Sequence, residues 1–161
     1  MRPALIVLLL VSILPVFSKA QDSDSLLQAF RSEELSDSLR FDAIHKLTWS
    51  VIFSDMDKAK AYAGMHTELA NQTQNEKQRA RALNNLGVAH AVRADYETAQ
   101  KYYEDGLAIR EKIGDKPGMA ATFNNLGILF KEQNALPKAL DYFLRSLEIH
   151  EESGDKKNQS S

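Results

Sequence analysis

The feature that most constrains this chain is a segment that occurs twice, forty residues apart. Residues 80–116 align with residues 120–156 without a gap, and 13 of the 37 aligned positions are identical, where average composition gives roughly two. The longest shared block is Asn-Asn-Leu-Gly, at residues 84–87 and again at 124–127. A period of this length is typical of solenoids, in which each unit buries its apolar face on the next.

Apolar side chains recur at three- and four-residue spacing in each copy, which predicts two amphipathic helices per repeat. The fold class is therefore all-α, an α-solenoid of antiparallel helix pairs. Gly87 lies in the middle of a predicted helix, where glycine costs about 1 kcal/mol relative to alanine. We attribute this glycine to close approach of the paired helix at Ala99, and Gly127 with Ala139 repeats the arrangement.

The periodicity divides the chain into about three repeats, of which the first is degenerate. In that first repeat we expect Trp49, the only tryptophan, to be a buried core anchor. The turn Gly114-Asp115 predicts a helix stop and a helix start, and Gly154-Asp155 copies it. The predicted segments are a polar leader or N-terminal cap at 21–41, repeats at 42–74, 76–113 and 116–153, and at 154–161 either the truncated start of a further repeat or a disordered tail.

The first twenty residues differ in composition from the rest. Arg2 precedes an apolar run at 4–17, and small residues stand at 18 and 20, before Gln21. This pattern predicts a secretory signal peptide cleaved near Ala20/Gln21, and the alternative is an uncleaved N-terminal anchor. Cleavage gives a secreted or periplasmic protein, and no later stretch is apolar and long enough to span a membrane.

Composition argues against several function classes. A net charge of −2 and a pI near 6.1 provide no basic surface for nucleic acid. The chain has no cysteine, its four histidines lack metal-ligand spacing, and no catalytic motif is present. We therefore expect no catalytic residues, no metal and no cofactor, and we expect His90, on the apolar stripe, to be a packed core residue.

Helix pairs with these glycine, alanine and tyrosine positions resemble the tetratricopeptide repeat, in its forty-residue variant found in the N-terminal regions of bacterial sensor and signalling proteins. The resemblance covers about residues 42–153 and implies a concave groove, lined by the first helix of each repeat, that holds a protein or peptide segment. Hydrophobic residues stand where chaperone-tail binders of this family carry lysines, so a carboxylate clamp is not expected. The candidates for lining the groove are Asn84, Asn85, Val88 and Ala91 in the second repeat, and Asn124, Asn125, Ile128 and Lys131 in the third.

Two interpretations of the asparagine pairs remain open at this point. An amide offers a donor and an acceptor, so repeated amides can hold the backbone of an extended peptide. Asparagine is also a poor helix former, and one member of each pair can instead bridge neighbouring repeats.

The sequence thus predicts an exported, non-catalytic protein–protein interaction module. The alternative is the truncated sensory region of a larger signalling protein, of the histidine kinase or nucleotide cyclase type, without independent activity. The last predicted helix carries more apolar residues than one face can bury, among them Leu140, Leu144 and Leu147. Self-association through this helix is a further expectation.

Overall fold

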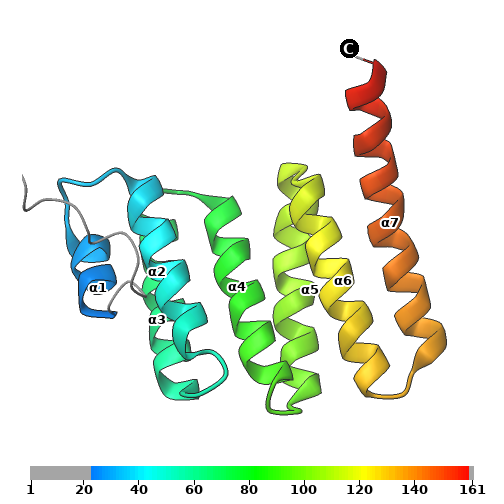
Figure 1. Cartoon of the computed structure of the whole chain (residues 1–161), viewed down its shortest axis with the longest axis horizontal. Coiled ribbons are helices and arrows are strands. Elements are labelled where there is room, and N and C mark those ends of the chain that lie inside the picture. The colour runs from blue at the N-terminus through cyan, green and yellow to red at the C-terminus, as the bar shows by residue number, and fades with distance from the viewer. Residues whose placement is uncertain (1–22, 160–161) are drawn as a thin grey trace, which may run out of the picture.

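The computed structural model describes residues 23–159, and the predicted signal peptide lies outside these residues. Within the described range the chain forms seven α-helices and no strand, arranged side by side in sequence order (Figure 1). The helices are α1 (Ser23–Arg31), α2 (Asp37–Val51), α3 (Met56–Gln72), α4 (Glu76–Ala91), α5 (Tyr96–Ile113), α6 (Lys116–Glu132) and α7 (Leu136–Gln159).

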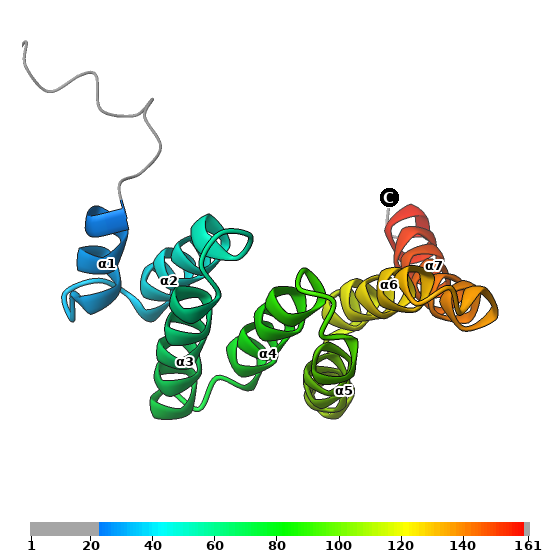
Figure 2. The same cartoon turned by 90° about the horizontal axis from the view of Figure 1, so that it is seen from below.

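Each helix packs against the next one in the sequence, and α4 also contacts both α2 and α6. The first helices of the three repeats, α2, α4 and α6, therefore follow one another along the array, with α3 and α5 on the other side of the row (Figure 2). This arrangement confirms the predicted all-α solenoid of antiparallel helix pairs. No helix among residues 23–159 is long and apolar enough to cross a membrane.

Side-chain caps fix where the middle helices begin. Asp55, Asn75 and Asp95 each accept a hydrogen bond from the backbone N–H three residues later, at 3.0, 3.1 and 3.4 Å. These bonds satisfy N–H groups that have no partner within the helix, so α3, α4 and α5 start at defined residues.

The two Gly-Asp turns differ in the structure. Gly114 adopts the left-handed conformation with φ of 68° and ends α5, as expected. Gly154 does not end a helix, because α7 continues through it to Gln159, so the expected start of another helix there is wrong. At the first turn, Lys77 of α4 lies 3.4 Å from the Asp115 carboxylate. The residue equivalent to Lys77 in the third repeat is Pro117, which has no charge with which to form the equivalent ion pair.

Close approach explains the mid-helix glycines, but through a different partner from the one expected. A Cβ atom at Gly87 would collide with the ring of Tyr103, and one at Gly127 would lie 2.6 Å from the ring of Phe143. The neighbour is therefore an aromatic ring one turn beyond Ala99, and the glycine makes room for that ring.

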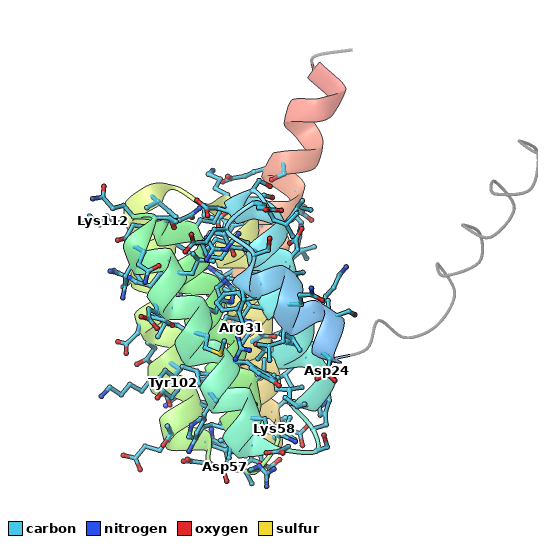
Figure 3. The ribbon with its side chains drawn as sticks, turned by 90° about the vertical axis from the view of Figure 1, so that its left-hand side faces the viewer. Asp24, Arg31, Asp57, Lys58, Tyr102 and Lys112 are labelled. Carbon is cyan, nitrogen blue, oxygen red and sulfur yellow. The ribbon has the colours of Figure 1, made fainter. Side chains whose placement is uncertain are left out.

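The first end of the array is covered by α1. Leu26 is 5% exposed and packs with Ala43, Ile44 and Leu47 of α2. Figure 3 looks onto this end, where α1 lies in front with the charged residues Asp24 and Arg31. Helix α1 thus places a polar surface over the apolar side of the first repeat, whereas α7 forms the opposite end (Figure 1).

Candidate functional site

A groove of about 420 Å³ lies along the first helices of the repeats. Trp49 of α2, Val92 at the end of α4 and Ile128 of α6 border it, and they are 40%, 44% and 44% exposed. Three exposed apolar side chains from three successive repeats therefore converge on one hollow. The other lining residues are Val88, Ala91, Ala94, Tyr96, Tyr103, Asn125, Leu129 and Glu132.

Trp49 is not the buried core anchor that the sequence predicts. The apolar side of α2 is filled by Ile44, Leu47 and Ile52, all 0% exposed. Trp49 lies two residues after Leu47, which is about 200° around the helix, so its ring faces away from that core. It packs instead edge-on to His45, with ring centroids 6.1 Å apart, at the rim of the groove.

Of the eight candidate residues, four line the groove: Val88, Ala91, Asn125 and Ile128. Asn84 is half-buried beside it, and Lys131 is exposed next to it on α6. The remaining two lie elsewhere.

The expectation that Asn85 faces the groove is wrong. Asn85 is 1% exposed, and its side-chain amide lies 3.1 Å from the Nδ1 atom of His45 in the preceding repeat. Asn124 is exposed, but it borders a different depression, between α6 and α7 at the end of the array. The structural-bridge interpretation therefore holds for Asn85.

A second polar bridge joins the next pair of repeats. The Asn125 amide donates a hydrogen bond of 2.9 Å to the side-chain oxygen of Asn84. The bridge orients the Asn125 side chain, which borders the groove, and a side-chain oxygen and a second amide hydrogen remain for a ligand. One asparagine of the third repeat thus combines a structural and a potential binding role.

The floor of the groove is apolar and its rim carries charge. Tyr103 is 3% exposed, and burial raises the pKa of its hydroxyl, so the ring is neutral at physiological pH. Glu132 borders the groove, and its carboxylate lies 3.8 Å from the Lys131 ammonium. Both of these side chains are more than half exposed, so the pair contributes little to stability.

Two of the histidines, His66 and His90, are buried. His90 is 7% exposed, which confirms it as a packed residue, and its Nδ1 atom lies 2.7 Å from the Asp95 carboxylate. The hydrogen bond from His90 is the main reason that the pKa of Asp95 is lowered. His66 is fully buried, and within residues 23–154 no group of three or more His, Cys, Asp or Glu side chains could hold a metal ion.

Sequence reasoning missed the residues at the groove rim that come from outside the repeated motif. Val92, Tyr96 and Glu132 lie at helix ends beside the turns that close each helix pair. Whether these side chains border the groove depends on how closely the two helices of each pair approach each other at the turn. The sequence could have predicted that Trp49 faces away from the core, since its angular position relative to Leu47 is fixed by helix geometry.

The sequence profile of the tetratricopeptide repeat matches residues 54–152. Among solved structures, the crystal structure of BtubC (BKLC) from P. vanneervenii is similar, with a TM-score of 0.62 and 21% sequence identity. The similarity covers 80% of this chain and 53% of BtubC, so the chain spans about half the length of that protein. At this identity the likeness concerns the fold alone. No curated protein matches the sequence at a significant level.

Proposed function

Because the chain belongs to the tetratricopeptide repeat family, we propose that it is a protein–protein interaction module that binds a peptide or protein segment in its groove. The observation that carries this proposal is the convergence of Trp49, Val92 and Ile128 on one hollow. Exposed apolar side chains gathered in a concave surface, with a few polar groups among them, are typical of recognition sites.

The chemistry of the lining favours an apolar anchor held by polar contacts. An aliphatic or aromatic side chain of the ligand packs between Trp49 and Ile128, and the ligand backbone bonds to the Asn125 amide. Glu132 and Lys131 place one charge of each sign at the rim next to that anchor, where polar groups of the ligand can bind. Full burial of one large apolar side chain contributes about 2 kcal/mol, so several such contacts are needed for micromolar binding.

Replacing Ile128 by glutamate is expected to weaken ligand binding about tenfold or more, because a carboxylate would then occupy an apolar part of the groove. The ligands are dodecapeptides selected on the unmodified protein from a random phage-displayed library. Binding is measured through Trp49, the only tryptophan, whose fluorescence reports directly on the groove.

The matched control is Leu39→Glu, which introduces the same charge at a 53% exposed leucine of α2 that does not line the groove. We expect this variant to bind like the unmodified protein. If both variants lose affinity equally, or if Ile128→Glu binds normally, the groove is not the binding site.

We further propose that the module acts outside the cytoplasm. The support is the sequence of residues 1–20, with Arg2, the apolar run at 4–17 and small residues before Gln21. Expression of the full chain in a secreting host is expected to give a protein that begins at Gln21, as measured by intact mass. An intact N-terminus in the purified protein would mean that the apolar segment is retained as an anchor.

A further inference from the structure

The outer face of α7 is an apolar stripe at the end of the array. Leu136, Leu140, Leu144 and Leu147 are 57%, 59%, 55% and 51% exposed. Their spacing of four, four and three residues places all of them on one side of the helix. A stripe of this kind is the usual contact surface between two packed helices.

The internal repeats are polar or small where α7 is most apolar. Counting back forty residues, Leu140 corresponds to Gln100 and Leu144 to Glu104. These two α5 side chains hydrogen-bond to each other at 2.7 Å on the exposed surface, although α6 packs next to α5. Stacking of one repeat on another therefore does not require leucine at these positions.

The same comparison holds one repeat earlier. Forty residues before Gln100 and Glu104 stand Lys60 and Gly64 of α3, both exposed. A Cβ atom added at Gly64 would meet no other atom within 4 Å, so this side of α3 is open. The middle of the stripe, Leu140 and Leu144, is thus particular to α7. Its two ends, Leu136 and Leu147, correspond to Tyr96 and Leu107, which pack on the core between the second and third repeats.

Charge along α7 selects the direction of pairing. The first turn of α7 contains no acidic residue, whereas Glu148 and Glu151 are exposed in its second half. A helix N-terminus carries a partial positive charge and is stabilised by nearby carboxylates. Two α7 helices in antiparallel orientation place the glutamates of each helix near the N-terminus of the other, whereas parallel helices bring like charges together.

We infer that two copies of this chain pair through their α7 helices, antiparallel, about a two-fold axis that passes between Leu140 and Leu144. Each Leu136 then lies near Leu147 of the second copy, and all eight leucines are covered. The opposite end of the array cannot take this role, because α1 covers it and presents Asp24, Gln28 and Arg31 to solvent. The pairing is independent of the groove, whose lining includes no residue of α7.

The first test is light scattering of the full chain during size-exclusion chromatography, at loading concentrations from about 1 to 200 µM. We expect a mass that rises to twice that of the monomer. The double variant Leu140→Gln/Leu144→Glu restores the α5 residues and is expected to weaken association about 100-fold or more. Its circular dichroism should equal that of the unmodified protein, because both leucines are exposed.

The control Leu39→Gln removes an exposed leucine from α2 and is expected to remain dimeric. A monomeric unmodified chain over the whole range overturns the proposal and leaves the stripe to a different protein. A double variant that stays dimeric also overturns it, since association would then arise elsewhere.

The second test uses the absence of cysteine from the sequence. With Asp141→Cys, two copies bring their new thiols together near the axis, and oxidation is expected to give a disulfide-linked dimer. With Glu148→Cys the two thiols lie about 18 Å apart along the antiparallel helices, at 1.5 Å per residue, and no cross-link forms. A cross-link through Glu148→Cys, or no cross-link through Asp141→Cys, would contradict the antiparallel arrangement.

Discussion

Gly87→Leu is expected to destabilise the protein by about 3 kcal/mol or more, because the new side chain must share its place with a buried aromatic ring. Even the Cβ atom would collide with Tyr103, which is 3% exposed and packs in the core between α5 and α6. The ring cannot leave without opening that core. The measurement is chemical denaturation at neutral pH, followed by circular dichroism.

Gly64→Ala is the matched control, since Gly64 also lies inside a helix but has open space around it. Alanine is preferred to glycine there by about 1 kcal/mol, so this variant should be more stable than the unmodified protein. In the double variant Gly87→Leu with Tyr103→Ala the leucine takes space left by the ring, so its loss of stability is expected to be smaller than the sum of the losses of the two single variants. An unchanged midpoint for Gly87→Leu alone would show that the helices do not approach closely at this position.

Lowering the pH from 6.5 to about 4 is expected to remove about 3 kcal/mol of stability through His66 alone. His66 is fully buried between α2, α3 and α4; its Nε2 atom lies 3.0 Å from the Gln78 side-chain oxygen, and its ring packs on Phe41. Burial lowers the pKa of His66 from 6.5 to about 4. The unfolded chain therefore binds a proton between these values that the folded protein does not, so unfolding becomes easier as the pH falls.

His45 acts in the same direction. Burial and the positive charge of Arg81 lower its pKa to about 4, and its Nδ1 atom accepts the hydrogen bond from Asn85 in the unprotonated form. Protonation would end the bridge between the first two repeats. We thus expect acid unfolding to begin at the N-terminal half of the array.

The pH dependence is measured by urea denaturation at intervals between pH 7 and pH 4. His66→Gln should reduce the slope of stability against pH, whereas His150→Gln, at an exposed position of α7, should leave it unchanged. A stability that stays constant between pH 6.5 and pH 4.5 in the unmodified protein would contradict the buried neutral state of both histidines.

The sequence by itself determined the architecture, because the architecture depends on local regularities. The forty-residue period, the helical spacing of apolar residues and the left-handed glycine at Gly114 each follow from short stretches of chain. Four of the eight candidate residues line the groove for the same reason, since the face of a regular helix is set by counting residues.

Only the tertiary structure shows which polar side chains form hydrogen bonds between neighbouring repeats. Asn84 and Asn85 are neighbours with the same chemistry, yet one meets Asn125 of the next repeat and the other meets His45 of the previous one. Arg110 is 6% exposed, and its guanidinium donates a hydrogen bond of 2.6 Å to the backbone oxygen of Gly118 on α6. Such pairings depend on the angle at which one repeat stacks on another. That angle results from the sum of many packing contacts, so it cannot be predicted from any single stretch of sequence.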